Sequence, residues 1–312
     1  MPKITILGAG ITGLAIASQL PSNYDITIVA KELPGDDTLK WASPWAGAIW
    51  MPIHGANAEE QRVQLNSLAF LTKLAASNPE STVRFEVLPK SRYPEGVKYA
   101  MKYNAVTMHP QNLIKWLESR LKAKGVKFHR AGVTSLGALK HMGHDVLINA
   151  SGLGAAALKD VHDPQIMPCV THLIEVRHPY DQIWMRHNKD YSVYTYILPR
   201  GDGTAVLGGS RFYGEWVPKI IPEVRQGIID RLHKNLPEHF PADIKDIDFI
   251  SDITGVHQQQ EGGLKLYKQH LNGQDVVHAY AFRGGGFMLS FGLANEVAQM
   301  VNKHLFTYDA RL

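Results

Sequence analysis

The chain has 312 residues, 45% of them apolar, which is enough to bury the core of one large domain or of two interlocked domains. Lys and Arg outnumber Asp and Glu by only four (33 against 29) and are scattered, so the charge argues against a nucleic-acid partner. Cys169 is the only cysteine, which excludes an intrachain disulfide and a cysteine-rich metal site; we interpret it as a small buried hydrophobe. No run of about 18 uncharged apolar residues occurs, so no membrane-spanning helix and no membrane partner are predicted.

The N-terminal segment predicts a β-α-β unit. Residues 2–20 form an apolar strand, a glycine turn and a helix, and residues 24–30 form a second strand. The turn Gly8-Ala9-Gly10-Ile11-Thr12-Gly13 fits the dinucleotide-binding pattern G-x-G-x-x-G. Its glycines permit the tight turn, the approach of a pyrophosphate and the packing of helix on strand. The residues expected at the pyrophosphate are Gly8, Gly10, Ile11, Thr12 and Gly13; this motif does not choose between FAD and NAD(P).

The end of the second predicted strand departs from the usual dinucleotide pattern. An acidic residue about twenty positions after the glycines usually binds the ribose hydroxyls. Here Ala30 and Lys31 stand at that position and Glu32 follows one step late. We expect Lys31 to contact a phosphate or to cover the adenine, and Glu32 to serve either as the ribose ligand or as a solvated loop charge.

The rest of the chain alternates between helical and strand patterns. Helices are predicted over 57–78, 109–125, 222–237 and 293–306, and strands over 126–136 and 145–158. From about residue 160 strands dominate, with a hairpin turn at Gly201-Asp202-Gly203. Residues 275–282 return to the parallel pattern. The order predicts a nucleotide-binding sheet assembled from both ends of the chain, with an antiparallel sheet inserted between them.

Several blocks of the sequence resemble the D-amino-acid oxidase family, which includes the D-aspartate oxidases. They are GAGITGL (8–14), ASPWAGAIWMP (42–52), VTMHPQNLIKWLESRLKAKGVKF (106–128), VTSL (133–136), LINASGLGA (147–155), YILPR (196–200), LGGSRFYGEW (207–216) and HAYAFRGGGF (278–287). The resemblance implies a mixed α/β (α+β) fold: a Rossmann-like FAD-binding domain with an interlocked antiparallel-sheet substrate domain. We expect the FAD-binding domain over 1–80, 105–160 and 272–312, and the substrate-binding domain over 81–104 and 161–271.

The resemblance also implies non-covalently bound FAD and a set of residues around it. Ala46, Gly47 and Ala48 are expected near the isoalloxazine ring, and Val133 by the adenine. The remaining residues expected to contact the cofactor are Ser43, Ser151, Gly152, Gly284, Gly285, Gly286, Phe287 and Met288. The C-terminal glycines would let the backbone approach a planar ring, and the helix after them would direct its positive end at the reduced flavin. No metal is expected.

Tyrosines and a cation are the expected substrate ligands. In the family a hydride leaves the substrate α-carbon for flavin N5, the imino acid hydrolyses, and O2 is reduced to hydrogen peroxide. An arginine and tyrosines bind the substrate carboxylate, which a planar guanidinium meets with two hydrogen bonds. Tyr196 matches one family tyrosine, and Tyr191 and Tyr194 are the alternatives for the second.

The family's carboxylate-binding arginine is missing. Gln260 stands at or beside its position in the stretch Gly255-Val256-His257-Gln258-Gln259-Gln260-Glu261. Arg283, beside the glycines, is the leading candidate for a relocated cation, and Arg186 and Arg211 are the alternatives. Otherwise the substrate lacks a free carboxylate, and His257 and the glutamines bind amide or hydroxyl groups.

The sequence therefore predicts an FAD-dependent oxidase of D-amino acids or related amines that uses O2. The alternatives are a tailoring oxidase acting on a larger amine without a free carboxylate, and a flavin-binding protein without turnover; an NAD(P)-dependent reductase fits less well. Ala310-Arg311-Leu312 resembles the Ser-Lys-Leu peroxisomal signal, so we expect a peroxisomal or otherwise cytoplasmic protein. A homodimer is a further expectation.

Overall fold

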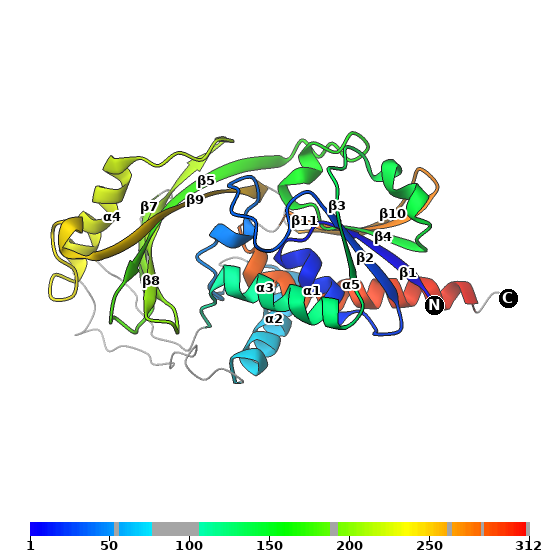
Figure 1. Cartoon of the computed structure of the whole chain (residues 1–312), viewed down its shortest axis with the longest axis horizontal. Coiled ribbons are helices and arrows are strands. Elements are labelled where there is room, and N and C mark those ends of the chain that lie inside the picture. The colour runs from blue at the N-terminus through cyan, green and yellow to red at the C-terminus, as the bar shows by residue number, and fades with distance from the viewer. Residues whose placement is uncertain (53–55, 77–105, 188–192, 261–263, 282–283, 310–312) are drawn as a thin grey trace.

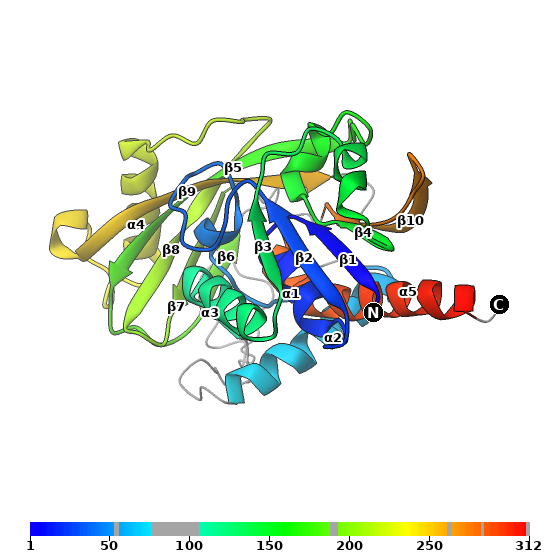
Figure 2. The same ribbon diagram turned by 45° about the vertical axis from the view of Figure 1, so that its right-hand side comes forward.

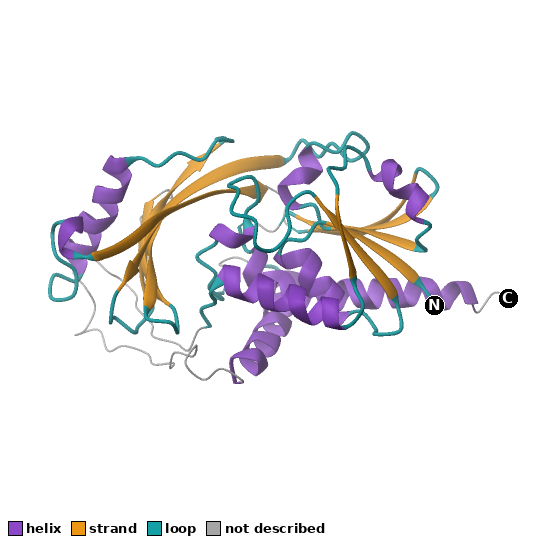
Figure 3. Ribbon diagram, viewed as in Figure 1, coloured by secondary structure: helices purple, strands orange, loops and turns teal. Residues whose placement is uncertain are grey.

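The computed structural model describes residues 1–52, 56–76, 106–187, 193–260, 264–281 and 284–309. Two sheets stand at opposite ends of the molecule, with a layer of helices beneath one of them and a single helix outside the other (Figures 1 and 3). The described part of the chain thus confirms the predicted combination of a parallel and an antiparallel sheet.

The six-stranded sheet is the nucleotide-binding sheet that the sequence predicts. Its strands, in spatial order, are β10 (Lys265–Leu271), β11 (Gln274–Tyr280), β4 (Val146–Asn149), β1 (Lys3–Leu7), β2 (Asp25–Ala30) and β3 (Lys127–Arg130). All neighbours pair in parallel except β10 and β11, which form an antiparallel hairpin. Segments from both ends of the chain therefore share one sheet.

Alternating apolar side chains cover both faces of this sheet. Ile4, Ile6 and Ile28 pack into the large core formed with the helices, whereas Leu7 and Val29 pack on the other face with η4 (Leu136–Met142). The helices on the first face are α1 (Ile11–Gln19), α2 (Ala58–Ala76), α3 (Pro110–Ala123) and α5 (Gly286–Asp309). Figure 2 shows α1 and α5 running below β1 and β2.

The five-stranded antiparallel sheet lies in the chain between β4 and β10. Its strands, in spatial order, are β6 (Trp184–His187), β7 (Val193–Pro199), β8 (Thr204–Tyr213), β5 (Ile166–Arg177) and β9 (Asp248–Gln260). Helix α4 (Pro222–Asn235) packs on its outer face, where Ile228, Ile229 and Leu232 meet Ile174 and Ile197. The inner face carries Leu173, Tyr196 and Ile253, which pack against Trp45 and Ile49. Two further single turns are η5 (Gly152–Ala156) and η6 (Ile244–Asp246).

The strands differ from the expected ones in two places. The strand expected over 126–136 already ends at Arg130, whereas the segment 145–158 forms a strand to Asn149 and then the small-residue turn expected at its end, η5. Strand β10, which falls within the expected substrate-binding segment 161–271, instead forms the edge of the six-stranded sheet. Its hairpin with β11 turns at Asn272 and Gly273, whose φ angles of 54° and 70° suit a tight two-residue turn.

The N-terminus and the end of helix α5 lie toward the same side of the molecule (Figure 1). Helix α5 begins inside the expected glycine run, at Gly286, and is longer than the predicted 293–306. The residues 81–104 and the terminal Ala310-Arg311-Leu312, on which the peroxisomal prediction depends, lie outside the described residues. Among the described helices, none is both long and apolar enough to cross a membrane.

A glycine sets the close crossing of α5 over α2. A Cβ at Gly292 would lie 1.9 Å from the carbonyl oxygen of Val63, and the Gly292 N–H donates to Ser67 Oγ at 2.7 Å. We expect Gly292→Ala to lower the free energy of unfolding by about 3 kcal/mol, because the two backbones would have to separate. Urea denaturation followed by circular dichroism measures this.

Gly227→Ala in α4 is the matched control. A Cβ there would meet only Arg231 Nη1, at 3.2 Å, which is the far end of a flexible side chain. Alanine also favours a helix over glycine by about 1 kcal/mol. An equal loss of stability in both variants would contradict the proposed packing.

Candidate functional site

The N-terminus of α1 has the backbone geometry of an anion-binding turn. Gly8 has a φ of +114°, and a Cβ there would lie 2.4 Å from the carbonyl oxygen of Ala150, so glycine is required. A Cβ at Gly13 would lie 2.0 Å from the Gly8 oxygen, which confirms that Gly13 lets the helix pack closely. The first turn of α1 carries no acidic residue, so no side chain of its own neutralises the positive end of the helix dipole.

Ser43 lies directly in front of this turn. It begins η1 (Ser43–Trp45), and its Oγ accepts a hydrogen bond from the Ile11 N–H at 3.0 Å. A Cβ at Gly10 would lie 2.9 Å from the same Oγ. The structure therefore brings Ser43 together with the predicted pyrophosphate-binding residues, although the two segments are 32 residues apart in sequence.

The parallel strands of the six-stranded sheet all end at one edge. β1 pairs with β2 and β4, β2 with β3, and β4 with β11, each in parallel. Open α/β sheets bind ligands at this carboxyl edge. The segments that follow the strands carry the predicted cofactor residues: Gly8, Gly10, Ile11, Thr12 and Gly13 after β1, Lys31 after β2, Val133 after β3, Ser151 and Gly152 after β4, and Gly284, Gly285, Gly286, Phe287 and Met288 after β11.

A buried asparagine that the sequence analysis missed holds the turn after β4. Asn149 Oδ1 accepts hydrogen bonds from the Ser151 N–H at 3.2 Å and from Ser151 Oγ at 2.7 Å. Its Nδ2 lies 3.2 Å from Nδ1 of His278, whose pKa is lowered to about 4 by burial. The signal in the sequence was a polar residue at the end of an otherwise apolar strand.

Lys31 and Val133 lie at the same edge of the sheet. Lys31 Nζ pairs with Glu32 Oε1 at 3.5 Å, and its side chain is 64% exposed, against 16% for Glu32. Val133 is half-buried against the cluster that contains Leu7 and Val29. Their roles at the adenine and phosphate stay predictions.

The two backbone segments expected at the flavin ring both contact the inner face of the antiparallel sheet. A Cβ at Gly47 would lie 3.3 Å from Tyr196 Oη and 3.0 Å from Leu198 Cδ1. A Cβ at Gly284, whose φ is +76°, would lie 3.1 Å from His257 Nε2. Tyr196 is therefore placed at one segment and His257 at the other, which brings the predicted cofactor and substrate elements together.

Tyr196 and Tyr194 are adjacent on this inner face. Their ring centroids are 5.2 Å apart, and the Tyr196 side chain is buried, with its ring filling the space left by Gly208. Burial raises the pKa of both tyrosines, so both hydroxyls are protonated hydrogen-bond donors at physiological pH. Between the two alternatives for the second tyrosine, Tyr194 lies here and Tyr191 lies outside the described residues.

Arg211 is the cation that the structure places beside these tyrosines. Its Nε donates to Tyr194 Oη at 3.0 Å, and its guanidinium lies over the Tyr194 ring, 4.5 Å from the centroid. Burial opposes its charge, but the hydroxyls of Tyr194 and Tyr213 outweigh this and raise the pKa of Arg211. Among the ion pairs between described residues, none involves Arg211.

The register of the sheet explains why Arg211 faces inward. Arg211 pairs across β8 and β5 with Thr171, and Thr171 pairs across β5 and β9 with Gly255. Directly opposed residues share a face of a sheet. A Cβ at Gly255 would lie 2.9 Å from Trp45 Cβ in η1, so this row of residues faces the cofactor-binding segments.

Arg186, another cation expected at the substrate, lies away from these tyrosines. Arg186 Nη1 donates to Asn235 Oδ1 in α4 at 2.7 Å, and Arg186 pairs with Thr195, whose hydroxyl accepts from Arg231 of α4. Arg186 therefore lies on the outer face, and its interpretation as a substrate cation is wrong. Arg283 lies outside the described residues, and Gln260 ends β9 without a described side chain.

His257 and Gln259 form a second polar group on the inner face. Gln259 Nε2 lies 3.0 Å from His257 Nε2, and a Cβ at Gly284 would approach both, at 3.3 and 3.1 Å. Burial first, and then the charge of Arg211, lowers the pKa of His257 to about 4. The imidazole is therefore neutral at physiological pH. Cys169, which pairs with His257 in the register, is buried as expected, and burial raises its pKa to about 11.

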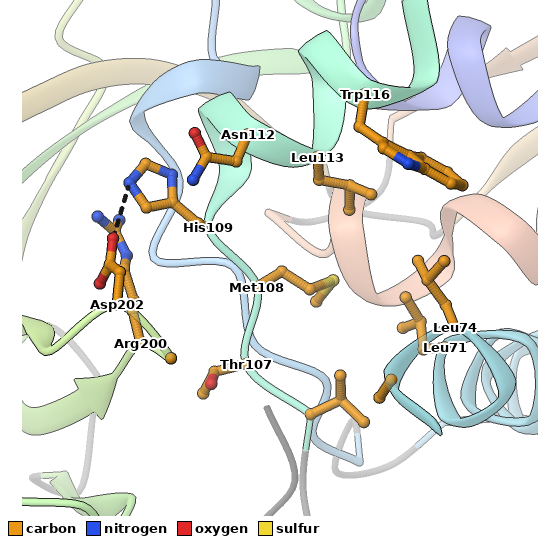
Figure 4. A pocket seen from close by; sticks show the side chains of 13 residues that line it. Leu71, Leu74, Thr107, Met108, His109, Asn112, Leu113, Trp116, Arg200 and Asp202 are labelled. Carbon is orange, nitrogen blue, oxygen red and sulfur yellow. Dashed lines mark ion pairs between the residues drawn. The ribbon is translucent and has the colours of Figure 1, made fainter. Parts of the chain in front are cut away.

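A separate cavity of about 340 Å³ lies between α2, α3 and the β7–β8 hairpin (Figure 4). Leu71, Leu74 and Trp116 line one side, and His109, which pairs with Asp202 at 3.8 Å, lines the other. None of the residues predicted to contact the cofactor or the substrate lines it. It is not the candidate site.

Comparison with known proteins decides the family. Residues 80–300 match the family described as "DAO: FAD dependent oxidoreductase". The chain belongs to this family. The DAO family's cofactor is FAD, so this protein is an FAD-dependent oxidoreductase.

The similarity to individual relatives supports the same family assignment. A D-aspartate oxidase from Talaromyces thermophilus is 27% identical over 96% of this chain and 95% of its own. A D-amino-acid oxidase from Fusarium vanettenii is 25% identical over 96% of each chain. Glycine oxidase from Geobacillus kaustophilus shares the fold, with a TM-score of 0.76, 17% identity and coverage of 97% of this chain and 95% of its own.

The residues present fit FAD. The α1 turn lacks acidic side chains, and the glycines at 8, 10 and 13 are packed as a pyrophosphate-binding turn requires. Gln258 Oε1 is buried without a hydrogen-bond partner among the described residues, 4.0 Å from the Cβ position of Gly152 at the same edge. A buried unpaired acceptor there is consistent with a polar ligand.

The glycine turn yields a direct test of this fit. We expect Gly10→Val to weaken FAD binding at least tenfold, because its side chain would meet Ser43 and fill the approach to the helix N-terminus. The ratio of flavin to protein absorbance and titration of the apoprotein with FAD measure the change. Gly227→Ala is the control, and unchanged FAD affinity in Gly10→Val would contradict the assignment.

Proposed function

We propose that this protein oxidises the C–N bond of a D-amino acid, giving an imino acid that hydrolyses to the oxo acid and ammonia, while O2 becomes hydrogen peroxide. When bound, FAD accepts the hydride from the α-carbon and returns two electrons to O2. The observation that carries the proposal is the Arg211–Tyr194–Tyr196 cluster on the face that meets the segments around Gly47 and Gly284. The names of the two relatives support the same reaction class.

Arg211 would bind the substrate carboxylate in place of the missing family arginine. Its Nε donates to Tyr194 and a second hydrogen bond goes to Tyr213, which leaves the planar guanidinium three N–H groups, two of which suffice for a bidentate carboxylate. Stacking over the Tyr194 ring holds the guanidinium plane in one orientation. The α-carboxylate would therefore bind at β8 rather than at the end of β9.

Tyr196 and Tyr194 would complete the substrate site. Both hydroxyls stay protonated because burial raises their pKa, and each can donate to a substrate oxygen. Tyr196 lies against Gly47, so a substrate bound between Arg211 and Tyr196 would be held next to the segment expected at the flavin. Such positioning is the main contribution that a flavin oxidase needs from its side chains.

The proposal predicts a specific loss in Arg211→Gln. Removing one partner of a buried carboxylate–guanidinium pair costs roughly 3 kcal/mol, so we expect the apparent Kd for a D-amino acid to rise about 100-fold. Anaerobic bleaching of the flavin at increasing substrate concentration gives this Kd, and a peroxidase-coupled assay reports hydrogen peroxide. Arg211→Lys should recover part of the affinity because it keeps the charge but not the planar fork.

Arg186→Gln is the matched control, since Arg186 lies on the opposite face of the same sheet. Equal effects in the two variants would contradict a specific role for Arg211. A flavin that bulky amines reduce but D-amino acids do not would instead favour the tailoring oxidase. A flavin that neither class reduces would favour a non-catalytic flavoprotein.

A further inference from the structure

The pair His257–Gln259 has no role in the reaction proposed above, yet it faces the same space. Both side chains are half-buried and project from β9 toward Gly284 at the start of the C-terminal glycine segment. They lie across the intervening strand β5 from Arg211, because Cys169 of β5 pairs with both His257 and Tyr213. Two strand spacings separate β8 from β9, about 10 Å, which is a span that one small amino acid covers together with the two side chains.

The pair presents a donor and an acceptor without charge. When Gln259 Nε2 donates to His257 Nε2, the histidine proton is on Nδ1, and Gln259 keeps one N–H and its Oε1 for another partner. His257 is uncharged because burial, with Arg211 nearby, lowers its pKa to about 4. The stretch 255–259 of β9 contains no Lys, Arg, Asp or Glu.

This neutrality discriminates between substrate side chains. A second carboxylate at this pair would be desolvated without an opposite charge, which is strongly unfavourable. An apolar group would leave the free Gln259 N–H and Oε1 unmatched. An amide or hydroxyl group offers an acceptor for the free Gln259 N–H and a donor for its Oε1.

We propose that His257 and Gln259 are the specificity-determining residues of this site and select a D-amino acid with an uncharged amide or hydroxyl side chain. The inference rests on the proposed function, in which Arg211 takes the only carboxylate of the substrate. The acidic D-amino acids, whose side chain carries a second carboxylate, would be the poorer substrates.

Three isosteric probes that cannot be oxidised at a C–N bond test this directly. Succinamate carries one carboxylate and one amide, succinate carries two carboxylates, and 4-methylpentanoate carries one carboxylate and an apolar fork. Their Kd values for the FAD-loaded protein follow from perturbation of the flavin absorption spectrum. We expect succinamate to bind five- to tenfold more tightly than either of the others, as one additional matched hydrogen-bonding group provides. Likewise, kcat/KM for D-asparagine should be higher than kcat/KM for either D-aspartate or D-leucine.

Substitutions test whether His257 and Gln259 cause the preference for succinamate. Gln259→Leu and, independently, His257→Leu should remove the advantage of succinamate over 4-methylpentanoate and leave the Kd of the latter within about twofold. Gln269→Leu is the matched control, because it removes another glutamine–histidine contact, the one between Gln269 Oε1 and His278 Nε2 at 3.1 Å, in the other sheet. Flavin content and melting temperature identify a variant that has merely lost its fold.

The outcomes of these experiments separate a failure of this inference from a failure of the proposed function. Equal binding of the three probes, or tightest binding of succinate or 4-methylpentanoate, would overturn this inference and leave the proposed function standing. Persistence of the succinamate preference in both leucine variants would also overturn it. If none of the carboxylates bound, the carboxylate site at Arg211 and this inference would fail together.

Discussion

The parallel pairing of β11 with β4 is the constraint on which the site depends. It places the last strand of the chain beside the N-terminal nucleotide-binding unit, so that the segment from Gly284 emerges at the same edge as the Gly8 turn. Without that pairing the two glycine segments would have no common edge. The close packing at Gly8 and Gly13 then fixes α1 against this edge.

The inner face of the antiparallel sheet carries the side chains that we propose bind the substrate. One row of opposed residues, Arg211, Thr171 and Gly255, sets its orientation toward η1. On this face β8 carries Arg211 and β9 carries the uncharged pair His257–Gln259, and we propose that the first binds the substrate carboxylate and the second its side chain. If Arg211 binds the substrate carboxylate as proposed, the positive charge lies two strands across the sheet from the position that the family pattern implies.

The sequence predicted the fold well because its signals are local. The glycine turn after β1 and the apolar periodicity of α1 and α3 each specify structure within a few residues. The β10–β11 hairpin was missed although Asn272-Gly273 is a strong two-residue turn signal, since its assignment to a sheet depends on which distant strand it joins. The substrate side could not be derived for the same reason. Arg186 and Arg211 look alike in sequence, and only the register shows that they occupy opposite faces.

A crystal structure of the FAD-loaded protein with succinamate tests the proposed site most directly. We expect the isoalloxazine ring to contact the backbone at Gly47 and Gly284, the carboxylate to bind Arg211 and the amide to bind Gln259. A ring bound away from these two glycines would contradict the placement of the site. A carboxylate held by Arg283, with Arg211 bound only to Tyr194 and Tyr213, would contradict the relocation of the cation to β8.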